Sequence, residues 1–141
     1  MSRIASLALA GALALTPLAA RADAKVEGQW HLDVSATIAA VKATGKVPDQ
    51  DLAKMQTDLA QVGNSFSLTF AGAKLRAATG QDVINCDWSW GKDGEVLPSK
   101  CLDQAGKAND MDPAHEAIRL VGSNLHLIDK DAGLALVFRR G

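Results

Sequence analysis

The two cysteines of this chain, Cys86 and Cys101, lie on either side of an Asp93-Gly94 dipeptide and are equally far from it in sequence. Asp-Gly is strongly preferred in the two-residue type I′ turn of a β-hairpin, because both central residues of that turn need positive φ. With this turn, Cys86 falls directly opposite Cys101, where Cα atoms are ~4.5–5.5 Å apart, a separation that a disulfide spans. The sequence therefore predicts an antiparallel hairpin over residues 84–102 that is closed by a Cys86–Cys101 disulfide.

The same register predicts which side chains of the hairpin share a face. Trp90 is expected opposite Leu97. Pro98 is expected on the polar face, at a position that donates no ladder hydrogen bond. A four-residue loop over residues 91–94 is the alternative, and it would shift the pairing by two and set the cysteines diagonally. The expected apolar face consists of Ile84, Cys86, Trp88, Trp90, Leu97 and Cys101.

Residues 1–24 have the features of a secretory signal peptide. An apolar run covers residues 4–15, and the small-residue tripeptide Ala22-Asp23-Ala24 suits cleavage by a signal peptidase. The run is shorter than the ~20 apolar residues that a membrane-spanning helix needs, and no later stretch approaches that length. We therefore expect a signal peptide over 1–24, a single β-rich domain over 25–141, and a periplasmic or secreted location, where disulfides persist. No transmembrane segment is expected in the mature chain.

The mature chain is expected to carry little net charge. Removal of residues 1–24 takes Arg3, Arg21 and Asp23 from a chain of net charge −1, which leaves about −2. Nucleic-acid binding needs a basic stripe, and attraction to an anionic membrane needs clustered basic residues. We therefore expect as partner neither nucleic acid nor a membrane surface, but a small apolar molecule or an envelope protein.

Two helices are predicted after the first strand. Apolar and polar residues alternate over residues 26–34, which is typical of a strand. Asp33 or Ser35 can then cap a helix that stops at Gly45, because glycine readily adopts the left-handed conformation of a helix end. Asp49 is expected as the N-cap of a second helix. The apolar residues of this second helix are Leu52, Met55, Leu59 and Val62.

From residue 65 onward, apolar residues recur at every second position, which predicts strands. The strands predicted there, together with the first strand and the two arms of the cysteine hairpin, make about eight strands. The expected fold class is therefore mainly β (α+β), a small antiparallel barrel or curved sheet of about eight strands with a helical hairpin after strand one. The further strands are expected at 66–70, 73–77, 117–121, 125–129 and 134–139.

Gly28-Gln29-Trp30 on the first strand, followed by a helix pair, resembles the Gly-x-Trp motif and the element order of the lipocalin and fatty-acid-binding (calycin) superfamily. In lipocalins an arginine near the last strand covers this tryptophan. The resemblance therefore implies that Arg139 or Arg140 lies over Trp30, and that the barrel binds a small molecule. A second likeness, to the META domain of bacterial envelope proteins, rests on residues 125–133 and on Phe138-Arg139-Arg140.

The sequence contains no recognisable catalytic constellation. The cysteines are expected to be bonded to each other, and no Gly-x-Ser-x-Gly nucleophile elbow occurs. We therefore expect a protein that is not an enzyme and has no cofactor. Residues of metal-ligand type gather once, but they lack the full calcium-loop pattern and equally suit a solvated turn, so no metal site is predicted. They are Asp110, Asp112, His115 and Glu116.

The aromatic residues suggest the first of two functional hypotheses. In a chain without tyrosine, tryptophan and phenylalanine must supply most of the bulky core. Some of them can instead line a cavity, since about eight strands can enclose one small ligand. We expect an exported, non-enzymatic module that binds a small apolar or amphipathic molecule. Its expected wall residues are Trp30, Trp88, Trp90 and Phe70.

The polar segment over residues 103–113 suggests the second hypothesis, a protein-binding inhibitor or immunity-type protein of the envelope. A connection of this length is often functional, and a rigid sheet can present it at little ordering cost. Asp110 and Asp112 are its expected contact residues, because an acidic loop can enter a basic cleft. As solvated loop charges, they would contribute little to stability.

Overall fold

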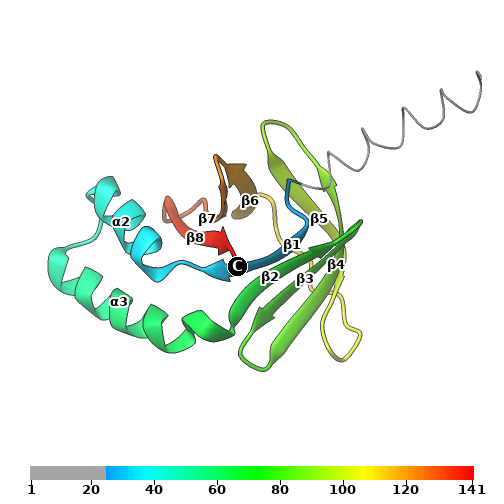
Figure 1. The fold of residues 1–141 in the computed structure, drawn as a ribbon, viewed down its shortest axis with the longest axis horizontal. Helices are drawn as coiled ribbons and strands as arrows, with labels where there is room; N and C mark the ends of the chain where they lie inside the picture. Colours follow the sequence, from blue (N-terminus) through cyan, green and yellow to red (C-terminus); the bar gives the residue numbers. More distant parts are fainter. Residues whose placement is uncertain (1–24) are drawn as a thin grey trace, which may run out of the picture.

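Eight antiparallel strands close into a barrel in which each strand pairs with the next along the chain and the last pairs with the first (Figure 1). The computed structural model describes residues 25–141. The predicted fold class is confirmed, while the predicted signal peptide over residues 1–24 lies outside the described residues. The strands are β1 (Gly28–Leu32), β2 (Phe66–Ala71), β3 (Lys74–Thr79), β4 (Asp82–Trp90), β5 (Glu95–Leu102), β6 (Glu116–Val121), β7 (Asn124–Asp129) and β8 (Leu134–Arg140). Between β1 and β2 lie α2 (Val34–Thr44), α3 (Asp49–Val62) and the short 3₁₀ helix η1 (Gly63–Ser65).

The helix α2 begins directly after β1, which makes the strand shorter than predicted. Of the two predicted caps, Asp33 is the one used, because its Oδ1 accepts a hydrogen bond from the Ala36 N–H at 2.9 Å. The helix stops at Gly45, whose φ of 70° is left-handed. It packs against β8, where the buried Thr37 Oγ1 accepts a hydrogen bond from the Val137 N–H at 2.9 Å.

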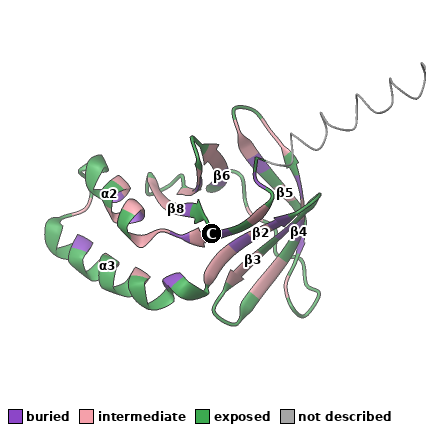
Figure 2. Ribbon diagram, viewed as in Figure 1, coloured by how far each residue is buried: buried purple, intermediate pink, exposed green. Residues whose placement is uncertain are grey.

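The helix α3 packs against α2 and turns one apolar stripe inward (Figure 1). Leu52 is buried, Met55 and Leu59 are half-buried, and most other side chains of the helix are exposed (Figure 2). The predicted N-cap is wrong by one residue, because Pro48 occupies that position and Asp49 is already helical. An acidic residue in the first turn still interacts favourably with the helix dipole. No helix within residues 25–141 is long and apolar enough to cross a membrane.

Barrel closure between β1 and β8 is centred on Trp30, which lies directly across from Arg140. The indole N–H of Trp30 donates to the Val26 carbonyl at 2.8 Å, and the ring is only 1% exposed. The Arg140 guanidinium carbon lies 4.6 Å from the ring centroid, a cation–π distance. The same guanidinium donates to the carbonyls of Glu27 and Lys25. The expectation that Arg139 or Arg140 covers Trp30 is confirmed for Arg140.

Aromatic side chains fill the end of the barrel that is remote from the helices. Phe70 meets Trp88 edge-to-face at 5.3 Å between ring centroids, and Trp88 meets Trp90 in the same way at 5.2 Å. Val96 and Leu125 are fully buried beside them in the same core cluster. Edge-to-face pairs stabilise beyond the area that they bury, so these rings contribute to the stability of this end.

The cysteine hairpin has the predicted turn but a different register. Asp93 and Gly94 have φ of 56° and 75°, and the Glu95 N–H donates to the Lys92 carbonyl at 3.0 Å, as in a type I′ turn. However, the Gly91 N–H also donates to the Glu95 carbonyl, so two residues of one arm oppose one of the other. This β-bulge shifts the pairing by one residue.

The predicted pairing of Trp90 with Leu97 is therefore wrong, since Trp90 lies opposite Val96 and Trp88 opposite Pro98. A shift of one residue moves side chains to the other face of a strand. Val96 is consequently buried and Leu97 is 38% exposed, whereas Pro98 faces the interior that was predicted for Leu97.

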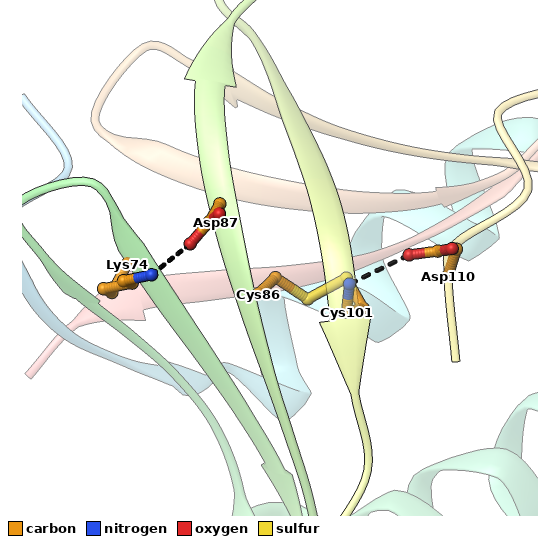
Figure 3. Close-up of a disulfide and its surroundings, with 5 residues drawn as sticks. All are labelled: Lys74, Cys86, Asp87, Cys101 and Asp110. Carbon is orange, nitrogen blue, oxygen red and sulfur yellow. Dashed lines mark hydrogen bonds and ion pairs between the residues drawn. A yellow bond between two sulfur atoms is a disulfide. The ribbon is translucent and has the colours of Figure 1, made fainter. Parts of the chain in front are cut away.

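A second bulge restores the predicted position of the cysteines. Asp87 pairs with Ser99, but Asn85 pairs with Leu102, so β5 carries one extra residue in this interval. Lys100 has a φ of 51° within it. The bulge turns Cys101 back to the interior, where its Sγ lies 2.03 Å from that of Cys86 with the Cα atoms 4.1 Å apart (Figure 3).

Oxidation of this pair gives the first prediction. The purified protein should be two hydrogens lighter by intact mass than the same protein after reduction. Loss of a cross-link that closes a loop of 15 residues should lower the free energy of unfolding by ~3 kcal/mol in the chain-entropy account. Urea denaturation with and without reductant measures this difference.

The matched control is the double variant Cys86→Ala with Cys101→Ala, whose urea midpoint should not respond to reductant. Free thiols in the native protein, or an equal response of the variant, would contradict the disulfide.

Candidate functional site

The barrel interior is hollow at the end next to the helices. A cavity of about 230 Å³ lies there, below the half-buried Met111. Both tryptophans of the cysteine hairpin and Phe70 pack at the opposite end, whereas small or short side chains such as Ala77, Thr79 and Pro98 face this one. The remaining space therefore follows from the distribution of side-chain size along the strands. The other apolar wall residues are Phe66, Leu68, Leu75, Ile84, Cys86, Cys101, Ile118 and Leu127.

A second cavity, of about 300 Å³, lies between the helices and the ends of β6, β7 and β8. Its cover is formed by Val41 of α2 and by Met55 and Leu59 of α3. Glu116 and Leu127 line both cavities, so the two adjoin at these side chains. Because α3 packs mainly on α2 rather than on the strands, it covers this space without filling it.

The barrel wall beside the first cavity is completed by the segment over residues 103–113 rather than by a strand. The register of β5 with β6 comprises only Glu95 with Arg119 and Val96 with Ile118. Beyond these pairs, the segment folds back along β5 and bridges Leu102 through Ala108.

Asp110 fixes this returning segment to Cys101 of the disulfide. Its Oδ1 accepts a hydrogen bond from the Cys101 N–H at 2.9 Å (Figure 3). The Asn109 N–H also donates to the Cys101 carbonyl at 2.9 Å. Hydrogen bonds to the backbone of Cys101 therefore hold the segment that ends in Met111.

The two predicted partner-loop residues are thus engaged within the fold. Besides the bond of Asp110 to Cys101, Asp112 Oδ1 accepts from the Ala114 N–H at 2.9 Å, and the Asp112 carbonyl accepts from the Glu116 N–H at 2.9 Å. Both residues are exposed, so their carboxylates are solvated as well as hydrogen-bonded. They shape the turn that leads into β6.

None of the four predicted wall residues lines these two cavities, although Trp90 and Trp30 each border a separate hollow elsewhere, of about 250 Å³ and 380 Å³. Trp30, Phe70 and Trp88 are at most 7% exposed and belong to the packed core, and Trp90 packs against it. The walls of both cavities consist of other residues, mostly aliphatic. Sequence reasoning identified the aromatics because they are bulky, but space is left where side chains are small. Alternating Ala77 and Thr79, and Met111 within a polar segment, were the available signals.

The candidate metal ligands do not converge. Within residues 25–141, no group of three His, Cys, Asp or Glu side chains is arranged to hold a metal ion. His115 Nδ1 instead lies 2.7 Å from Asp131 Oδ2 on the surface, with Asp112 Oδ2 3.7 Å from its other ring nitrogen.

Among residues 25–141, two titrating groups have shifted pKa values, and both lie outside these two cavities. A hydrogen bond from Lys74 lowers the pKa of Asp87 on the exposed face of the sheet (Figure 3). Burial lowers the pKa of His126 on β7, because desolvation disfavours the imidazolium. Neither residue lines a cavity, so neither shift identifies a reactive group there.

Comparisons with known proteins leave the family open. No protein-family model matches the sequence, and no curated protein matches it. Among solved structures, the chain is similar to a DUF4847 family protein from Bacteroides vulgatus ATCC 8482, with a TM-score of 0.49 and 14% identity. The match covers 82% of this chain and 94% of that one.

The bond between Asp110 and Cys101 gives the second prediction. Asp110→Ala removes the only side-chain acceptor that the described residues offer to the Cys101 N–H. Loss of such a bond should lower the free energy of unfolding by on the order of 1 kcal/mol. Chemical denaturation under oxidising conditions measures it.

Asp58→Ala is the matched control, because Asp58 is exposed on α3 and makes no side-chain hydrogen bond or ion pair within residues 25–141. Equal stability of the two variants would show that Asp110 does not hold the segment.

Proposed function

We propose that this protein is an exported, non-enzymatic binding module that holds a small apolar or amphipathic molecule in the barrel cavity next to the helices. The observation that carries the proposal is the hollow interior itself, a largely apolar space within an otherwise packed barrel. Ligand sites are typically concave and mostly apolar, with few polar groups, and this space has that character.

The arrangement around the cavity supports binding from one end. The aromatic core closes the far end, so the ligand enters beneath α3 and beside Met111. The helix α3 is anchored through α2, and Met111 through the bond of Asp110 to Cys101 at the cavity wall. A cover held in this way can move without unfolding the barrel, since few buried contacts join it to the strands.

The resemblance to the calycin superfamily supports the same function. Gly28-x-Trp30, the Arg140 guanidinium over the indole, and a helix pair after strand one of a closed barrel are together similar to that superfamily. Such a resemblance implies a carrier of small apolar molecules. Export agrees with a disulfide-bonded chain that has no membrane-spanning helix within the described residues.

Filling the cavity gives the third prediction. Ala77 faces the cavity, whereas its neighbour Ala78 points to the opposite face of β3 and does not line it. Ala77→Phe should weaken binding of the neutral fluorophore N-phenylnaphthylamine about tenfold or more, because a ring occupies much of the space. Titration of probe fluorescence measures this, and circular dichroism checks that the variant is folded.

Ala78→Phe is the control of equal bulk and should bind the probe like the original protein. The intrinsic fluorescence of tryptophan is a poor readout, because the three indoles are not in the cavity wall. Absence of probe binding by the original protein, together with native mass spectra that show no co-purified small molecule, would overturn the proposal.

A further inference from the structure

The segment that covers the barrel cavity meets β5 at Cys101. The Asn109 N–H donates to the Cys101 carbonyl, and Asp110 Oδ1 accepts from the Cys101 N–H, both at 2.9 Å. Met111 follows directly in the chain and lines the cavity. The position of Met111 over the cavity therefore depends on where the backbone of Cys101 lies.

The backbone of β5 next to Cys101 has no favourable conformation of its own. In the bulge, Lys100 has a φ of 51°, a left-handed conformation that is unfavourable for a residue with a side chain. Without the bulge, the pairing of Asp87 with Ser99 would continue and place Lys100 opposite Cys86, with its side chain turned inward. Burial of an unpaired ammonium group is also unfavourable. Neither register of this end of β5 is therefore stable by itself.

The disulfide is the constraint that selects the bulged register. Cys101 is 2% exposed and is bonded to Cys86 in the cavity wall. Leu102, the next residue, pairs with Asn85 but is 46% exposed, so it buries little apolar area. Within residues 25–141, β6 does not pair with this end of β5. The covalent bond between the cysteines is therefore what mainly holds the end of β5 on β4.

We propose that the Cys86–Cys101 disulfide is a redox-sensitive latch on the cavity. A dithiol reductant opens the disulfide, and the end of β5 then leaves β4 together with the segment that ends in Met111. The wall of the cavity opens and the bound molecule is released. The inference rests on the proposed function and assigns the regulation of that same site.

The chemical step is thiol–disulfide exchange. One thiolate of the reductant bonds to Sγ of Cys86, which breaks the bond to Cys101 and releases Cys101 as a thiolate. The second thiolate of the reductant then forms the reductant's own cyclic disulfide and releases Cys86. Two electrons and two protons thus pass from the dithiol to the cysteines, which become thiols.

Binding and oxidation are then coupled in both directions. A molecule that binds the oxidised form more tightly makes the disulfide harder to reduce by the same factor. Both cysteines lie in the cavity wall and are at most 6% exposed, so a bound molecule also covers their sulfur atoms.

Titration of N-phenylnaphthylamine into oxidised protein, and into protein held reduced by dithiothreitol, tests the proposal. The reduced protein should bind the probe about tenfold more weakly, which is the order of effect expected from loss of contact with one large apolar side chain. Circular dichroism checks that the reduced barrel is folded. In buffers of reduced and oxidised dithiothreitol, saturation with the probe should raise the ratio needed for half-reduction about tenfold, by reciprocity.

Two variants of Lys100 separate the latch from a general loss of stability. Lys100→Gly adopts the left-handed conformation at no steric cost, so the bulge should persist after reduction and most of the probe affinity should remain. Lys100→Ala removes the same charge but keeps the unfavourable φ, so reduction should weaken binding as in the original protein. The double variant Cys86→Ala with Cys101→Ala should bind like the reduced protein whether or not reductant is present.

Equal affinity of the oxidised and reduced protein would overturn the latch but leave a binding cavity. The same conclusion would follow if Lys100→Gly lost as much affinity on reduction as Lys100→Ala, or if reduction unfolded the whole barrel. Absence of probe binding in both redox states would overturn the latch and the proposed function together.

Discussion

The pairing of β1 with β8 around Trp30 is the contact on which the barrel depends, because it joins the first strand of the fold to the last. Without it, the chain would be an open sheet with two unpaired edges. The indole is fixed by its bond to the Val26 carbonyl and covered by the Arg140 guanidinium, which also binds the carbonyls of the incoming chain. The Trp30 side chain thus takes part in barrel closure, in core packing and in positioning the N-terminal segment.

The closed barrel divides into two halves of different character. Around Trp88 the aromatic rings meet edge-to-face, whereas around Ala77 the walls are mostly aliphatic, with Phe66 as an aromatic exception, and a cavity remains. Interiors are normally packed as densely as organic crystals, so unfilled apolar space costs stability. This space, which α3 covers rather than fills, is the one to which the proposed ligand is assigned.

The disulfide helps to hold the wall of this cavity as well as the hairpin. Cys101 is bonded to Cys86 on one side and, through its backbone, to Asp110 on the other. The segment that ends in Met111 closes a stretch of wall where β5 and β6 are barely paired. The disulfide and the segment that ends in Met111 are therefore joined through Cys101.

The sequence by itself determined the strand and helix order, the type I′ turn and the partner of each cysteine, because these depend on local periodicity and on the φ preferences of single residues. It narrowed the cap of the first helix to Asp33 or Ser35, and the structure decided for Asp33. Only the tertiary structure decided the two bulges, since a bulge is set by how a strand curves into a closed barrel. The bulges exchanged the faces of Leu97 and Pro98. The location of the cavity was also a tertiary property, because unfilled volume depends on which side chains meet across the barrel.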